Sequence, residues 1–234
     1  MYKIIEFTGV PGSGKSYISQ ELTKYFINSS EYDEWEIIYL NFKKINKDFY
    51  KFKNLYNFFD IFIIKIIFTY LYHEKFTKRS ITSIKTILLG YYKYFLVGRL
   101  LNESHHDKHI FIIDEGILHV NNQLFSVFNY RKINSLFRRI KLHKVYKYYL
   151  TSYNYIIEMN INDAIINILN RESGWPYAWR NFNNSEKLKE MQKMENSILF
   201  NQSILIDYGV KLKKINDLES LEKLFKNISK EIFV

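Results

Sequence analysis

The chain has 234 residues, enough to bury one core, and it contains no cysteine, which excludes disulfides, thiolate metal sites and cysteine nucleophiles. Two prolines and eight glycines leave no room for a linker-rich layout of several domains. The formal net charge of +10 favours anionic partners, such as nucleotides, nucleic acid, an anionic membrane surface or a phosphorylated glycan.

The most specific motif lies near the N-terminus, where residues 9–16 match the phosphate-binding pattern G-x-x-x-x-G-K-[ST] in full. The apolar, β-branched segment Lys3–Thr8 before it predicts a buried strand, and the apolar spacing of Ser16–Asn28 after it predicts a helix. Because the motif needs this strand–loop–helix context, we predict nucleoside triphosphate binding rather than a purely structural turn. The predicted nucleotide-binding residues are Gly9, Val10, Pro11, Gly12, Ser13, Gly14, Lys15 and Ser16.

Two side chains of this loop have distinct expected roles. Lys15 should reach the β- and γ-phosphates of ATP as a catalytic cation, and the hydroxyl of Ser16 should be a ligand of Mg²⁺. The positive end of the following helix adds favourable charge for the phosphates.

Strands and helices are predicted to alternate along the rest of the chain. The predicted strands are Trp35–Phe42, His109–Asp114, Tyr153–Met159 and Val210–Ile215. The predicted helices are Gly116–Tyr130, Asn134–Thr151, Asp163–Asn170 with Asn162 as its cap, Lys187–Gln202 and Leu218–Ile232. This order predicts an α/β fold, a three-layer parallel five-stranded sheet in one domain over residues 1–234. A chain that leads directly into a strand without a signal peptide, and that lacks cysteine, is expected in the cytoplasm.

Residues 47–106 carry no convincing strand signal and are expected to form a helical insertion on the substrate side, between the second strand and the acidic strand. Within it, Leu55–Tyr72 is apolar enough to raise the question of a membrane contact. Asp60 and Lys65 interrupt the segment, and each costs about 2.5–3.5 kcal/mol at a bilayer centre. A buried or interfacial helix is therefore expected, and no transmembrane segment.

The strand His109–Asp114 ends in an acid, which is where a phosphate loop needs a carboxylate beside it. We expect Asp114 to hold the water shell of Mg²⁺ next to Ser16. Its neighbour Glu115 has two open interpretations. It either orients or deprotonates an attacking hydroxyl as a catalytic residue, or it is a second metal-shell ligand or an acid at a helix start.

A second informative segment, residues 171–180, places two arginines on either side of a Gly/Pro loop. Arg171 and Arg180 suit a lid that neutralises the transferring phosphoryl group and excludes water as it closes. The alternative is an ordinary connecting loop whose arginines pair with Glu172 or Glu186.

The chain contains, in this order, the phosphate loop of residues 9–16, the helical insertion, the acidic strand and the Arg-bearing loop. This order resembles that of the nucleoside and nucleotide kinases of the P-loop NTPase superfamily. Thymidylate kinase-like and deoxynucleoside kinase-like proteins have the most similar layout. The resemblance implies that Arg171 and Arg180 belong to a lid over ATP and that Asn216, Asp217 and Leu218 lie beside its base. Glu115 stands where thymidylate kinases usually carry arginine, and Asn167 stands where many members carry an earlier arginine.

The function that these features favour is an ATP-dependent phosphotransferase with a small-molecule acceptor such as a nucleotide, nucleoside or sugar. The alternative is a nucleotide-regulated ATPase or binding module. In that case the basic helix around Arg138–Lys147 and the aromatic insertion would dock on nucleic acid or an anionic membrane surface. The sequence does not identify the acceptor or the oligomeric state.

Overall fold

A computed structural model gives the fold of the protein and describes most of the chain. The described residues are 1–41, 64, 67–68, 71–72, 78–103, 105–116, 148, 151–172, 174–176, 179–207, 209–216 and 220–233.

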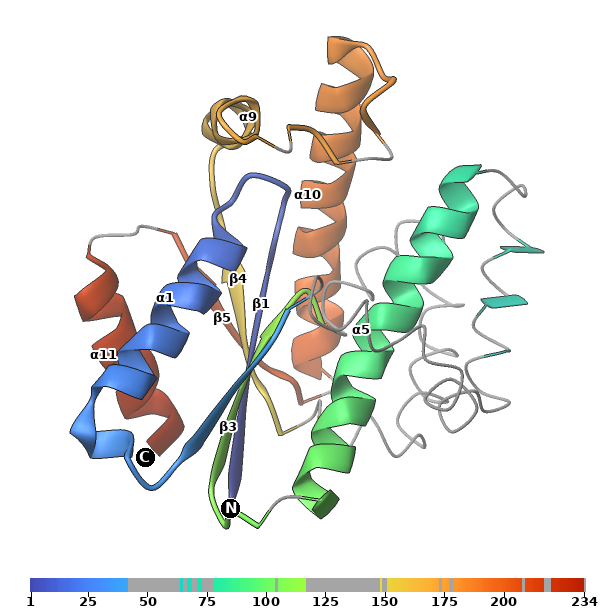
Figure 1. The fold of residues 1–234 in the computed structure, drawn as a ribbon. Helices are drawn as coiled ribbons and strands as arrows, with labels where there is room; N and C mark the ends of the chain where they lie inside the picture. The colour runs from blue at the N-terminus through green and yellow to red at the C-terminus, as the bar shows by residue number, and fades with distance from the viewer. Residues whose placement is uncertain are drawn as a thin grey trace.

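Five parallel strands form a single sheet in the order β2-β3-β1-β4-β5 (Figure 1). The strands are β1 (Tyr2–Gly9), β2 (Glu36–Leu40), β3 (His109–Asp114), β4 (Tyr153–Ile157) and β5 (Lys211–Ile215). The sequence predicted each strand to within two residues at either end, and β3 with both ends correct. The predicted parallel α/β sheet is confirmed. All five strands end at the same edge, so their C-terminal residues meet there.

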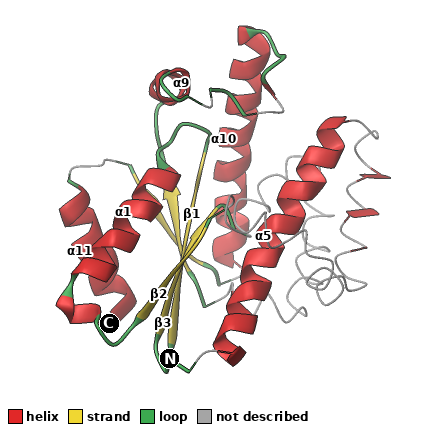
Figure 2. Cartoon of the chain, in the orientation of Figure 1, coloured by secondary structure: helices red, strands yellow, loops and turns green. Residues whose placement is uncertain are grey.

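Helices cover both faces of the sheet, which gives three layers (Figure 2). One face packs against α1 (Lys15–Asn28) and α11 (Leu221–Phe233), and the other against α5 (Lys78–Glu103), α9 (Ile161–Leu169) and α10 (Asn184–Asp207). Side chains alternate between these faces along each strand, so Ile4 packs on the α5 side and Ile5 on the α1 side.

Local hydrogen bonds place the starts of two helices, α9 and α10, before their predicted positions. Asn162 does not cap α9, because Asn160 holds the non-helical position and its side-chain oxygen accepts from the N–H of Asn162 at 2.8 Å. Asn183 and Glu186 form a reciprocal capping box (2.8 and 2.9 Å), so α10 begins at Asn184 rather than at Lys187.

Several predicted features lie wholly or largely outside the described residues. They are the helices Gly116–Tyr130 and Asn134–Thr151, the basic segment Arg138–Lys147, most of Leu55–Tyr72, and the part of the insertion 47–106 that precedes α5. Among the described helices, none combines the length and apolar character needed to cross a membrane.

Candidate active site

The phosphate loop lies between β1 and α1, as the motif predicts. Gly12 and Gly14 have φ angles of +92° and +83°, in the left-handed region that side chains with a Cβ atom seldom adopt. The loop is closed by backbone hydrogen bonds from Ser13 N to Val10 O (3.2 Å) and from Ile18 N to Gly14 O (3.0 Å). The helix α1 begins at Lys15, so its first N–H groups are available to an anion at the loop.

Helix α9 lies directly on this loop (Figure 1). A Cβ atom added at Gly12 would lie 2.2 Å from the backbone oxygen of Ala164 in α9. The side-chain amide of Asn167 donates to the backbone oxygen of Gly12 at 3.1 Å. At the position where many of the resembled kinases have an arginine, this chain therefore has an amide that holds the phosphate loop itself.

Lys15 and Glu115 form an ion pair across the strand ends. Lys15 Nζ lies 3.1 Å from Glu115 Oε1 and 3.5 Å from the backbone oxygen of Val10. Lys15 is buried, whereas the side chain of Glu115 is 27% exposed. The expected phosphate-binding cation and the expected catalytic carboxylate thus share one site.

Asp114 lies at the end of β3 beside the start of α1. It is buried, and its Oδ1 atom has no hydrogen-bond partner among the described residues. Burial is the main cause that raises the pKa of Asp114, and the negative charge of Glu115 adds to it. The charges of Lys15 and Lys93 and the hydroxyl of Ser16 act in the opposite direction.

A buried carboxylate oxygen without a partner fits a hydrated Mg²⁺ ion, because the ion and its water molecules supply both charge and hydrogen bonds. The hydroxyl oxygen of Tyr39 is another buried polar atom without a hydrogen-bond partner among the described residues. The pKa of Tyr39 is raised by burial first and then by the nearby charge of Asp114. The pair Ser16 and Asp114 is thus chemically suited to the metal that the sequence predicts there.

Lys93 is a further member of the site that sequence reasoning missed. It lies in α5, is fully buried, and donates hydrogen bonds to the backbone oxygens of Asp114 and Glu115, the latter at 3.0 Å. Burial lowers the pKa of Lys93, against the charges of Asp114, Glu115 and Glu6, which raise it. The sequence signal that could have indicated this role is a single lysine inside the aromatic run of residues 91–95. A lysine at a buried position needs charged or polar partners.

Both predicted lid arginines are exposed, on the segment that follows α9. Arg180 Nε donates to the backbone oxygen of Trp175 at 3.3 Å, a contact within the loop. Glu186, one of the two alternative partners, accepts from the backbone of Asn183 in its capping box. The role of Arg171 and Arg180 in a lid stays a prediction.

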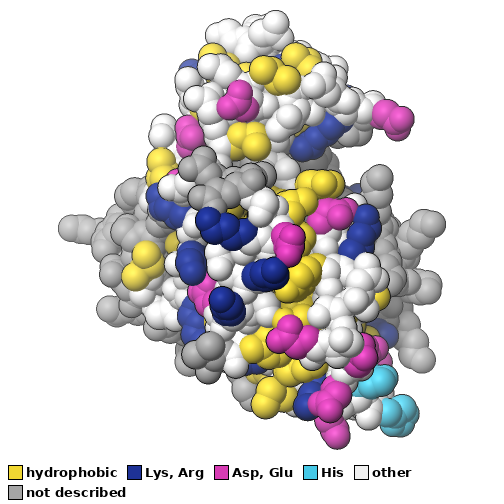
Figure 3. Space-filling model, turned by 90° about the vertical axis from the view of Figure 1, so that its left-hand side faces the viewer, with side chains coloured by type: hydrophobic (Ala, Val, Ile, Leu, Met, Phe, Trp, Pro, Cys, Tyr) yellow, Lys and Arg dark blue, Asp and Glu magenta, His cyan; other side chains and the backbone are white. Residues whose placement is uncertain are grey.

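The predicted base-contacting turn follows β5. Asn216 is exposed and lines an open groove of about 610 Å³ between β5 and α11, with Lys213 and Lys230 among the other lining residues. Figure 3 shows lysine and arginine side chains gathered on this side of the molecule. Asp217 and Leu218 lie outside the described residues.

Comparison with solved structures supports the family resemblance at the level of fold. Thymidylate kinase from Ehrlichia chaffeensis is 12% identical, with a TM-score of 0.51 over 98% of each chain. Deoxyadenosine kinase from M. mycoides with bound dATP is 13% identical, with a TM-score of 0.51 over 99% of this chain and 100% of that one. No protein-family model and no curated protein matches the sequence. The full-length coverage and the shared sheet show that this chain has the fold of the P-loop nucleotide kinases.

Proposed function

We propose that the protein is an ATP-dependent phosphotransferase that transfers the γ-phosphoryl group of ATP to a small-molecule acceptor. The observation that carries the proposal is the pairing of Lys15 with Glu115 at 3.1 Å, next to Asp114 and at the phosphate loop. A phosphate-binding cation and a carboxylate able to accept a proton then stand on either side of one reaction centre. We also propose that the protein acts in the cytoplasm.

In this mechanism the loop residues 9–16 bind the polyphosphate through backbone N–H groups. Ser16 and Asp114 would hold Mg²⁺, which when bound neutralises charge on the phosphate oxygens. Lys15 exchanges its contact with Glu115 for the β- and γ-phosphates. Glu115, released from this ion pair, orients the attacking oxygen of the acceptor and takes its proton when that oxygen belongs to a hydroxyl group, while ADP leaves as the bond to the γ-phosphorus breaks.

Arg171 and Arg180 complete the site by closing over the donor, where their charge opposes the charge that develops on the transferring group. Asn216 and Asp217 lie beside the base of ATP in this proposal. A nucleotide or nucleoside is the acceptor class that the fold favours, since the solved structures with this fold act on thymidylate and on deoxyadenosine. A sugar hydroxyl remains a second class to test.

The alternative function, a nucleotide-regulated module that docks on nucleic acid or an anionic membrane, has the surface lysines in its favour. Several of these lysines already have acidic partners. Lys213 pairs with Glu231 at 3.0 Å, and Lys226 pairs with Glu222 at 2.7 Å. A docking function would make binding to RNA, DNA or anionic vesicles fall steeply with rising salt concentration.

The decisive experiment measures ADP release from Mg·ATP with a panel of nucleoside monophosphates, nucleosides and sugars. A reaction without acceptor distinguishes a kinase from an ATPase. We expect at least one acceptor to raise ADP release above that background and to appear as its phosphorylated product. Acceptor-independent ADP release with salt-sensitive binding to a polyanion would support the alternative instead.

A further inference from the structure

Two consecutive residues of α5 contact the sheet near the phosphate loop, one at the end of β3 and one in the interior of β1. Lys93 donates to the backbone oxygens of Asp114 and Glu115, and the hydroxyl of Tyr94 donates to Glu6 Oε2 at 2.5 Å. Lys93, Tyr94 and Glu6 are all fully buried. One turn of α5 therefore holds the end of β3 through one residue and the interior of β1 through the next.

The turn that Lys93 contacts has an unfavourable backbone conformation. Glu115 has a φ angle of +56° and is the one described residue other than glycine with a positive φ. This conformation costs free energy for a residue with a Cβ atom and persists where neighbouring contacts enforce it. At the next position, a Cβ atom on Gly116 would lie 2.6 Å from Glu6 Oε2, so the turn passes close to the carboxylate that Tyr94 contacts.

We propose that Lys93 is a positioning residue for the two carboxylates of the site. Its ammonium group holds both backbone oxygens of the turn and so fixes the directions in which the side chains of Asp114 and Glu115 leave the backbone. Asp114 is then directed toward Ser16, and Glu115 toward Lys15. The inference rests on the proposed function, to which it adds a residue that need not touch ATP or the acceptor.

The burial of Lys93 supports this role over one in simple packing. A fully buried ammonium group is costly unless charges and hydrogen bonds compensate it. Here the compensation comes from two backbone oxygens and from the nearby carboxylates of Glu6, Asp114 and Glu115. A leucine or methionine would fill the same space in α5 without that cost, but it would leave the turn unheld.

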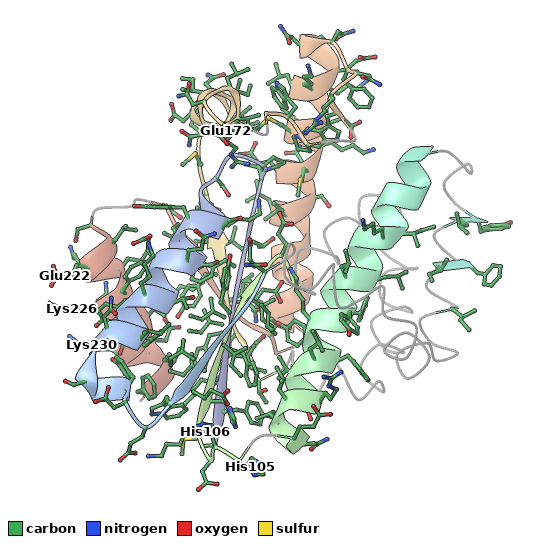
Figure 4. All side chains as sticks on the ribbon, in the orientation of Figure 1. His105, His106, Glu172, Glu222, Lys226 and Lys230 are labelled. Carbon is green, nitrogen blue, oxygen red and sulfur yellow. The ribbon has the colours of Figure 1, made fainter. Side chains whose placement is uncertain are left out.

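The test compares Lys93→Met with wild type in three measurements. They are ATP affinity in EDTA, the gain in ATP affinity on adding Mg²⁺, and kcat. Because Lys93 acts on the turn after β3 in this proposal, affinity in EDTA should stay close to the wild-type value. The gain from Mg²⁺ and kcat should each fall by about 10-fold or more, as when the partner of a metal-binding carboxylate is lost. The control is Lys226→Met, the same change at an exposed lysine on α11 (Figure 4).

Tyr94→Phe distinguishes positioning from general docking of α5. It removes the neighbouring hydrogen bond to Glu6 and leaves both contacts of Lys93 in place, so it should lower thermal stability more than kcat. An equal loss of kcat in Tyr94→Phe and Lys93→Met would overturn the inference. So would a folded Lys93→Met protein with wild-type kcat and a wild-type gain from Mg²⁺.

If Lys93→Met does not fold, Lys93→Gln takes its place in the same measurements. Glutamine keeps one N–H donor group but loses the charge, so the gain from Mg²⁺ and kcat should fall in the same direction. Wild-type values in folded Lys93→Gln overturn the inference alone. A wild-type protein that binds no ATP, with or without Mg²⁺, overturns the proposed function and this inference with it.

Discussion

At the scale of single residues, Lys15 carries the largest expected share of transition-state binding. Its ammonium group lies in a buried position, where a contact with developing charge is worth more than in water. We expect Lys15→Met to lower kcat by a factor that corresponds to about 2.7–4 kcal/mol, with the fold unchanged. Initial rates of phosphotransfer and the circular dichroism spectrum check both parts. Full phosphotransfer by Lys15→Met would remove Lys15 from the mechanism.

Asp114 makes a residue-scale prediction about stability. Burial raises its pKa in the folded state, so folding favours the protonated carboxyl. The contribution of Asp114 to stability is therefore complete below the unfolded pKa of about 3.9 and is lost as the pH rises through the higher folded pKa.

Asp114→Asn cannot ionise, so without Mg²⁺ it should unfold at a higher temperature than wild type at pH 7. The difference should shrink toward pH 4, and the variant should transfer no phosphate. Thermal unfolding at several pH values measures the effect. A lower unfolding temperature for Asp114→Asn at pH 7 would contradict the cost assigned to the buried carboxylate.

At the scale of elements, the contact of α9 with the phosphate loop depends on the absence of a side chain at Gly12. Gly12→Ala would place a methyl group 2.2 Å from the backbone oxygen of Ala164, whereas Gly14→Ala would have nothing within 4 Å. Both positions have a positive φ, so the two substitutions cause similar backbone strain. They differ in the clash with Ala164, which only Gly12→Ala creates.

We therefore expect Gly12→Ala to lose more stability than Gly14→Ala, because α9 must move away from the loop. The free energy of unfolding in urea compares the two variants without requiring activity. Equal losses would show that the contact between α9 and the loop adds little to the stability of the fold.

The loop after α9 makes a second prediction at this scale. If it closes over the donor during transfer, Arg171→Ala and Arg180→Ala should each lower kcat more than ATP affinity, because their contacts form mainly in the transition state. Steady-state kinetics and ATP calorimetry separate the two effects. Unchanged kcat in both variants would leave the segment as an ordinary connection.

At the scale of the whole molecule, the net charge has a structural use besides any role in binding. β5 is an edge strand and carries Lys211, Lys213 and Lys214. Lysines on an exposed edge discourage pairing with a strand from another chain. Part of the +10 charge is thus explained without a nucleic acid or membrane partner.

Binding of Mg·ATP should stabilise the whole fold, because the phosphate loop joins β1 to α1 and also touches α9. At an ATP concentration 100 times the Kd, the expected gain is about 2.7 kcal/mol. The unfolding temperature with and without Mg·ATP measures it, and Lys15→Met is the comparison in which the gain should shrink. No shift in the wild type at millimolar ATP would contradict nucleotide binding.

The extent of prediction from sequence differs between the fold and the site. The phosphate loop and all five strands could be found because their signals are local: a motif of eight residues and short apolar runs. The cap of α9 was misplaced by two residues, since Asn160 and Asn162 are both good caps and only the backbone angles choose between them.

The amino-acid sequence by itself determined the strand–loop–helix unit that can hold a triphosphate and the acidic end of β3, because residues adjacent in the chain encode both. Only the tertiary structure decided that Glu115 pairs with Lys15, that Asn167 holds the phosphate loop, and that Lys93 lies beneath the carboxylates. Those contacts join segments that are distant in sequence, and they depend on the helix faces that pack against the sheet, which no local pattern specifies.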